Sequence, residues 1–138
     1  TAEQLASAGP LDAIGIAGTA LTVHRKWLDA ISDNIANDNT AKPTDGAAFQ
    51  ARYIEAQEGP GNTGVYVAGT RLGDAEGRLV QDPSNPMADE DGYVRLPDID
   101  LGAQMSSLIL AQRGYQANAG VVDRAKETYQ AALQIGKS

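Results

Sequence analysis

The last forty residues decide the fold, and they read IDLGAQMSSLILAQRGYQANAGVVDRAKETYQAALQIGKS from Ile99 to Ser138. Apolar side chains recur there at alternating steps of three and four, which predicts one long helix with a coiled-coil-like seam. The predicted seam consists of Met105, Leu108, Tyr115, Ala119, Val122, Tyr129 and Leu133, with Gln112 and Lys126 as polar interruptions. Such a helix is roughly 55 Å long, which is more than a small domain needs. The seam therefore predicts a packing partner.

A second seam runs from Leu11 to Asn37 and predicts another helix. Ile14, Leu21, Leu28 and Ile35 are spaced by seven, with Ala17, His24 and Ile31 in the alternate position. Asn37 and Asn39 crowd the predicted end of this helix, and Pro43 follows shortly after. Asn tolerates the left-handed conformation that often ends helices, and Pro prevents continuation.

The segment between the helices loses the helical period and favours short strands. Strands are predicted in Ala48–Gln57, Val65–Thr70, Arg78–Val80 and Tyr93–Leu96. The fold class expected is therefore α+β, with two long terminal helices packed antiparallel and a small β-rich domain inserted between them. The expected boundaries are a tail over 1–10, a discontinuous helical assembly domain over 11–40 and 99–138, and an inserted domain over 41–98.

Composition excludes several classes of function. The 138 residues carry a net charge of -7, which argues against binding to nucleic acid, because that needs clustered Lys and Arg. No apolar run approaches the roughly 20 residues that span a bilayer, so direct membrane insertion is not expected. The chain has no Cys, which removes disulfides and thiolate metal sites. No cleavable signal peptide is visible at the start.

Three motifs resemble chemical sites, and each is better explained by ordinary structure. Gly59–Gly64 matches G-x-G-x-x-G, but it precedes a predicted strand instead of opening a helix, so it is read as a turn. Asp89–Gly92 resembles part of a calcium loop, but Met87 stands where the first carboxylate ligand is needed. His24, the only His, has no companion ligands. No catalytic, cofactor-binding or metal-binding residue is predicted.

Two features of the helices suggest contacts. Trp27 lies beside the first seam and is either an interface anchor or part of the chain's own packing; the sequence leaves both readings open. Gly114 and Gly120 interrupt the long helix and predict the close approach of another helix, which in an assembly would belong to a neighbouring subunit.

Three stretches resemble a known family, the flagellar basal-body rod proteins, and within it the proximal-rod type. Ser32–Thr40, SDNIANDNT, is similar to the family's S-x-N-I-A-N-x-x-T at the end of its first helix. Asp82–Val94, DPSNPMADEDGYV, followed by LPDID at 96–100, looks like the segment before the last helix and is the most specific match. Arg113–Asn118, RGYQAN, is similar to the family's Y-x-A-N region. The resemblance covers Leu11 to Gly136, nearly the whole chain.

The resemblance implies a structural subunit and not an enzyme. It implies export through the flagellar type III apparatus without a cleaved signal, and assembly in the periplasm into the rod that transmits torque to the hook. The implied partners are other rod proteins, copies of the same chain, and export-apparatus and basal-body components. A coiled-coil adaptor or a filament subunit of another secretion assembly is the alternative. The expected assembly interface is formed by Ile14, Leu21, Leu28, Ile31, Asn34, Ile35, Asn37, Met105, Leu108, Tyr115, Asn118, Val122, Tyr129 and Leu133.

Overall fold

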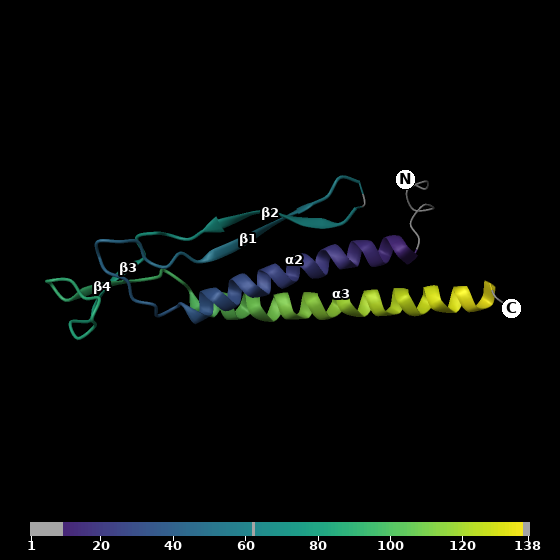
Figure 1. Ribbon diagram of the computed structural model, residues 1–138. Helices are drawn as coiled ribbons and strands as arrows, with labels where there is room; N and C mark the ends of the chain where they lie inside the picture. Colours follow the sequence, from purple (N-terminus) through teal and green to yellow (C-terminus); the bar gives the residue numbers. More distant parts are fainter. Residues whose placement is uncertain (1–9, 62, 137–138) are drawn as a thin grey trace.

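A computed structural model describes residues 10–61 and 63–136, and it contains two long antiparallel helices with a strand-rich segment between them in sequence. Helix α2 spans Pro10–Ala36 and helix α3 spans Leu101–Gly136. The two lie side by side, with the start of α2 and the end of α3 at the same end of an elongated molecule (Figure 1). The α+β architecture expected from the two seams is confirmed. The predicted tail lies outside the described residues, except for Pro10.

The ends of the helices follow from capping by Asn, Thr and Asp side chains. The Asn37 backbone N–H and side-chain amide both donate to the carbonyl of Asp33, at 3.0 and 2.8 Å, and Thr40 Oγ1 donates to Asn37 Oδ1 at 3.0 Å. The SDNIANDNT motif is thus a helix terminus. At the start of α3, Asp100 Oδ1 accepts from the Ala103 backbone N–H at 3.1 Å, as an N-cap does.

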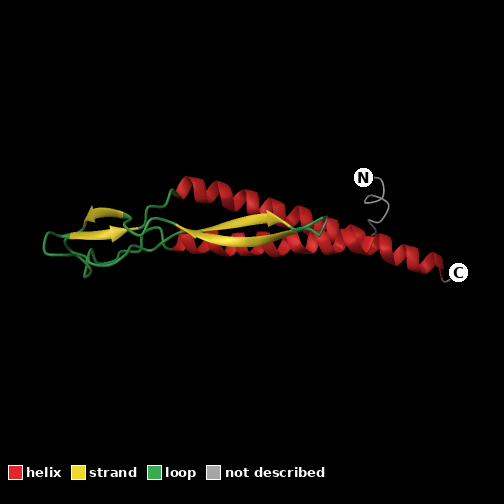
Figure 2. Cartoon of the chain, turned by 90° about the horizontal axis from the view of Figure 1, so that it is seen from above, coloured by secondary structure: helices red, strands yellow, loops and turns green. Residues whose placement is uncertain are grey.

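Four strands form two separate antiparallel pairs. Strand β1 (Arg52–Glu58) pairs with β2 (Val65–Leu72), and β3 (Arg78–Gln81) pairs with β4 (Tyr93–Leu96). The first pair carries a bulge between Glu55 and Ala56. It lies along α2 on the side away from α3, whereas the second pair lies beyond the helix ends (Figures 1 and 2).

Strand β1 begins later than the sequence predicted. Ala48–Ala51 belong to the predicted strand, yet only isolated backbone bonds tie this part to the chain, from Ala48 N–H to the Ala75 carbonyl and from Gly73 N–H to the Ala51 carbonyl. The residues of this stretch are buried or half-buried, but they do not form part of a strand pair. Their apolar character therefore indicates burial and not strand pairing.

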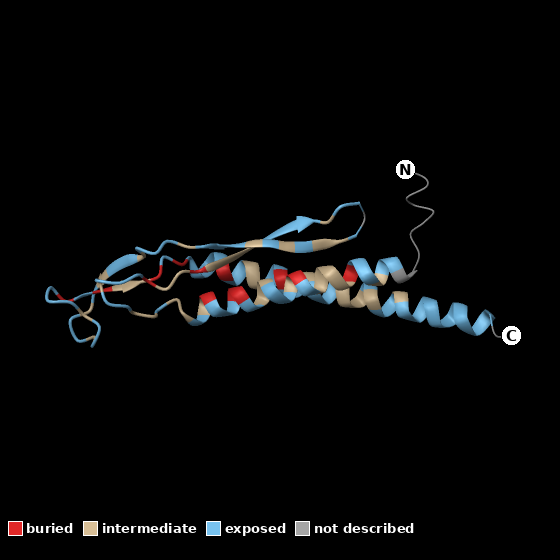
Figure 3. Ribbon diagram, turned by 45° about the horizontal axis from the view of Figure 1, so that its top comes forward, coloured by how far each residue is buried: buried red, intermediate tan, exposed pale blue. Residues whose placement is uncertain are grey.

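Helix α2 is the central layer, and the buried residues are mostly small. Ala17, Ala30 and Ile31 are at most 4% exposed, and the red segments in Figure 3 lie on the helices and at the base of the strand region. The accessible surface is 9073 Å² for 14.4 kDa, whereas a compact chain of that mass exposes about 6,800 Å². The molecule thus exposes about a third more surface than a compact monomer, so it offers large faces to partners.

Candidate assembly surface

The contact between the two helices is made by small and polar side chains of α3. Gln104, Ala111, Asn118 and Ala125 follow one another at steps of seven and are all buried or half-buried. On α2, Ala17, His24 and Ile31 repeat at the same step and are also buried or half-buried. Small residues allow the helix backbones to approach closely, but they remove little apolar surface from water. Leu108 and Val122 are half-buried beside these residues, whereas most of the other large apolar side chains of α3 stay exposed.

At Gly114, helix α3 lies close to α2 of the same chain. The predicted close approach of another helix is therefore found within one chain. A Cβ atom placed on Gly114 would collide with the His24 ring, reaching Cδ2 at 2.6 Å. His24 is held there by its Nδ1, which donates to the Ala20 carbonyl at 2.8 Å. Gly114 therefore faces the chain's own helix and not a neighbouring subunit. A Cβ at Gly120 would meet only the Arg124 guanidinium, at 3.4 Å.

Asn34 joins three elements at the point where the helices meet the strands. Its side-chain amide donates to the Arg52 carbonyl at 2.9 Å and to Gln104 Oε1 at 3.2 Å, and its Oδ1 accepts the Arg52 backbone N–H at 2.9 Å. Asn34 is 0% exposed. Arg52 also forms an ion pair with Asp33. Asn34 was expected at the assembly interface, but its hydrogen bonds close it inside its own chain.

The largest unburied apolar side chains gather on α3. Leu101, Met105 and Ile109 recur at steps of four, so they form one stripe on the helix, and each is more than 40% exposed. Tyr129 and Leu133 extend the face that contacts α2, but they lie near the end of α3, where 126–136 are all exposed. Figure 3 shows this end of α3 in pale blue beyond the end of α2. Each of these side chains keeps 38–49% of its surface exposed in the described part of the chain.

The predicted interface residues divide into a buried, a half-buried and an exposed group in the structure. Asn34 and Ile31 are buried, and a second set is half-buried against the chain's own elements, namely Ile14, Leu21, Leu28, Ile35, Asn37, Leu108, Asn118 and Val122. The exposed group, which is free for contact with other chains, is Met105, Tyr115, Tyr129 and Leu133.

Some contact residues were missed by the sequence prediction. Gln104 and Ala111 are the buried residues of α3, and Ile109 and Leu110 are 48% and 60% exposed. The repeat of Ala and side-chain amides at steps of seven was the signal that marked the buried face. Trp27 packs on its own chain, with its ring centroid 6.0 Å from that of His24.

The loop between β3 and β4, residues 82–92, is held by its own side chains. Asp89 Oδ1 accepts the backbone N–H groups of Asp91 and Tyr93 at 3.0 and 2.9 Å, and its Oδ2 accepts the Thr44 hydroxyl at 2.8 Å. The Tyr93 N–H contributes most, followed by the Thr44 hydroxyl, to lowering the pKa of Asp89 below its usual value of 3.8. Asp89 therefore acts as a structural anchor of the loop.

The candidate chemical motifs have structural roles. Gly59–Gly64 forms the connection between β1 and β2, as predicted, and Gly64 adopts a φ of 109° beside Thr19. Within residues 10–61 and 63–136, no three His, Cys, Asp or Glu side chains are grouped as a metal site would require. The same residues include no helix with the length and apolarity needed to cross a membrane.

Comparisons with known proteins agree with these features. The family described as the C-terminal part of flagellar basal-body rod FlgEFG proteins matches residues 90–135. The flagellar basal-body rod protein FlgC of Salmonella typhimurium is 34% identical over 92% of this chain and 98% of its own length. FlgC of Yersinia enterocolitica is 36% identical over the same shares, and FlgC of Bacillus subtilis is 29% identical over 90% and 96%. The chain therefore belongs to the FlgC family of flagellar basal-body rod proteins.

Proposed function

We propose that this chain is a structural subunit of the proximal rod and that it assembles through its terminal helices. In this role it packs against copies of itself and against other rod and basal-body proteins in the periplasm. It reaches that position through the flagellar export apparatus without a cleaved signal, and its helices contribute to the wall of the channel. Its function is mechanical and not enzymatic.

One observation carries the self-assembly part of the proposal. The face of α3 that packs on α2 continues through Tyr129 and Leu133, which are 38% and 49% exposed. Burying a large apolar side chain contributes about 1.5–3 kcal/mol. The seam continues past the described part of α2, and it gains this free energy when a helix of another subunit covers it. The chain belongs to a family of rod proteins, so neighbouring rod subunits would supply the helices that cover the seam.

The test uses two substitutions on the same exposed part of α3. Leu133→Asp places a carboxylate in the proposed contact, and Gln130→Asp, also at an exposed position, is the matched control. Because neither side chain is buried in the chain, both variants should keep the helix content and thermal stability of the parent. Substitutions at Leu108 or Val122 discriminate less well, since both are half-buried within the chain.

Each variant is expressed in cells that lack the native protein, and motility and hook–basal bodies are scored. We expect Leu133→Asp to be secreted but to give no assembled rods, whereas Gln130→Asp supports motility. Burial of an unpaired carboxylate costs several kcal/mol, which is enough to prevent the contact. Wild-type motility with Leu133→Asp would show that this seam is not an assembly contact.

A further inference from the structure

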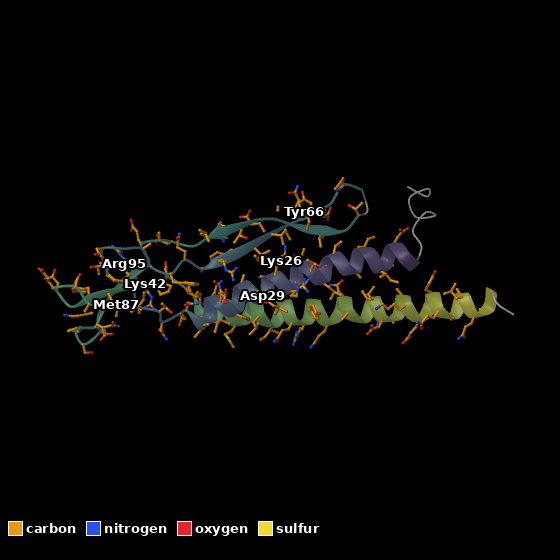
Figure 4. All side chains as sticks on the ribbon, in the orientation of Figure 1. Lys26, Asp29, Lys42, Tyr66, Met87 and Arg95 are labelled. Carbon is orange, nitrogen blue, oxygen red and sulfur yellow. The ribbon has the colours of Figure 1, made fainter. Side chains whose placement is uncertain are left out.

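The end of the molecule opposite the start of α2 and the end of α3 carries an acidic loop with an apolar tip. Loop 82–92 contains Asp82, Asp89, Glu90 and Asp91 and no Lys or Arg. At its turn Met87 is 48% exposed, and Figure 4 shows it at the far end of the molecule.

The tip of this loop has a fixed backbone. Asn85 Oδ1 accepts the Met87 backbone N–H at 2.9 Å, and the Asn85 carbonyl accepts the Ala88 N–H at 2.9 Å. Because the backbone is already ordered, the tip loses little conformational freedom when it binds. The loop is therefore a pre-formed apolar projection surrounded by negative charge.

A groove with the opposite character lies between α2 and β2. We call it the α2–β2 groove, and it is lined by Thr22, Val23 and Lys26 of α2 and by Val65, Tyr66 and Val67 of β2. Its volume is about 280 Å³. Lys26 is the one charged residue among those that line it, and Arg25 is exposed next to Lys26 in sequence. Figure 4 shows Lys26 and Tyr66 near the hairpin, well away from Met87.

We propose that loop 82–92 of one copy docks in the α2–β2 groove of a second copy. Met87 enters between the valine side chains and Tyr66, because its flexible thioether fills irregular apolar gaps and makes favourable contacts with aromatic rings. Glu90 and Asp91 then lie against Lys26. The charges are complementary, since the loop has four carboxylates and no cation while the groove has a lysine and no carboxylate.

The arrangement of the two surfaces favours a neighbour of the same kind. The loop lies beyond the helices and the groove lies alongside α2, so a chain with this shape does not fill its own groove. A contact between two different patches of identical chains is heterologous, and it propagates into a ring or a helical array. Such an array is the geometry of a rod, and the inference rests on the self-assembly proposed above.

The absence of Cys from the chain allows a direct cross-linking test. Single-cysteine variants Met87→Cys and Thr22→Cys, carrying tags of different size, are mixed and oxidised. The measurement is made on isolated hook–basal bodies and on concentrated purified protein. Met87→Cys with Gln116→Cys is the control pair, because Gln116 is exposed on α3 and does not line the groove. We expect a disulfide-linked dimer of the two tagged chains from the first pair and not from the control.

Charge reversal tests the ionic part of the contact. Lys26→Glu and Glu90→Lys should each lower the dimer yield about two- to fivefold, as expected for exposed ion pairs. Combining the two, one in each chain, should restore the yield. Both side chains are exposed, so circular dichroism of the monomers should stay unchanged.

The outcomes separate this inference from the proposed function. Assembled rods that contain the chain but give no Met87–Thr22 dimer, or as much dimer with the control pair, overturn the docking and leave the function intact. If the chain is missing from basal bodies, the proposed function is wrong. Cross-linking of the purified protein then still shows whether loop 82–92 docks in the α2–β2 groove. A photoreactive label on Thr22→Cys that captures a different protein in the basal body would assign the groove to that partner and reject a second copy.

Discussion

Replacing Asn34 by Asp should strongly destabilise the molecule, because the two side chains have nearly the same shape but an ionised carboxylate accepts hydrogen bonds and donates none. The amide of Asn34 donates to the Arg52 carbonyl and to Gln104 Oε1, at 2.9 and 3.2 Å. A carboxylate donates no hydrogen bond, so each of these contacts would join two acceptors. The bond from the Arg52 N–H to Oδ1 would survive.

The size of the effect follows from these two lost bonds. A buried polar group left without a partner costs about 1–3 kcal/mol, so two such groups and a buried charge give about 4 kcal/mol or more. Domains of this kind are stable by about 5–15 kcal/mol. A loss of 4 kcal/mol lowers the midpoint of thermal unfolding by about 10–15 °C for a chain of this length. At the lower end of that stability range Asn34→Asp keeps only about 1 kcal/mol of stability, so its unfolding midpoint should lie clearly below that of the parent chain.

The assay is unfolding by urea and by heat, followed by circular dichroism at the helical band. Asn39→Asp is the control, because it makes the same chemical change at an exposed position near the end of α2. It should change the free energy of unfolding by less than about 0.5 kcal/mol. If Asn34→Asp were as stable as Asn39→Asp, the three-element hydrogen bonding at Asn34 would not support the fold, and this reasoning would be refuted.

Two further predictions concern the strand-rich end of the molecule. Gly77→Ala should destabilise the packing of β3 by at least about 1–3 kcal/mol, because Gly77 has a φ of 59° and an added Cβ would reach Ala48 Cβ at 2.7 Å. The measurement is limited proteolysis near β3, which should be faster than in a Gly69→Ala control. Asp89 has a lowered pKa, so the stability that its carboxylate adds is present above pH 3.8 and is lost as the pH falls through its folded value. The amide signal of Tyr93 should follow that acid transition by NMR, and an unchanged transition in Asp89→Asn would assign it to another group.

Much of the architecture was predictable because it depends on local patterns. The spacing of Ile14, Leu21 and Leu28 and the Asn residues after them placed α2 within one residue at each end. Alternation in Val65–Val67 identified the β2 hairpin strand. These signals act over a few residues, and they agree with the elements that the folded chain forms.

The assignment of faces was less predictable. The seam predicted for α3 counted large apolar side chains, and Met105 and Leu133 in that seam are exposed, whereas Gln104 and Ala111 face α2. Periodicity reports every face that avoids water, including faces that other subunits cover, and it does not say which helix covers each one. Small residues carry little weight in such a pattern, although they determine where two backbones come close.

The hydrogen bonding of Asn34 was not predictable for a different reason. Its partners are 18 and 70 positions away, in β1 and in α3. Spacing within one motif contains no information about contacts between segments so far apart. The motif around Asn34 indicated correctly where the helix ends, but it did not indicate that the Asn34 side chain forms hydrogen bonds inside the subunit.

The pairing of α2 with α3 has a consequence for the order in which the chain folds. Contacts that join distant parts of a sequence form slowly, because a long loop must close before they give any stabilisation. Here α2 cannot complete its packing until α3, the last element of the chain, is available. The β1–β2 hairpin on its other side presents few large buried side chains. If the chain is exported N-terminus first under the function proposed above, it stays extended until α3 emerges. Completion of translocation and the onset of folding would then coincide.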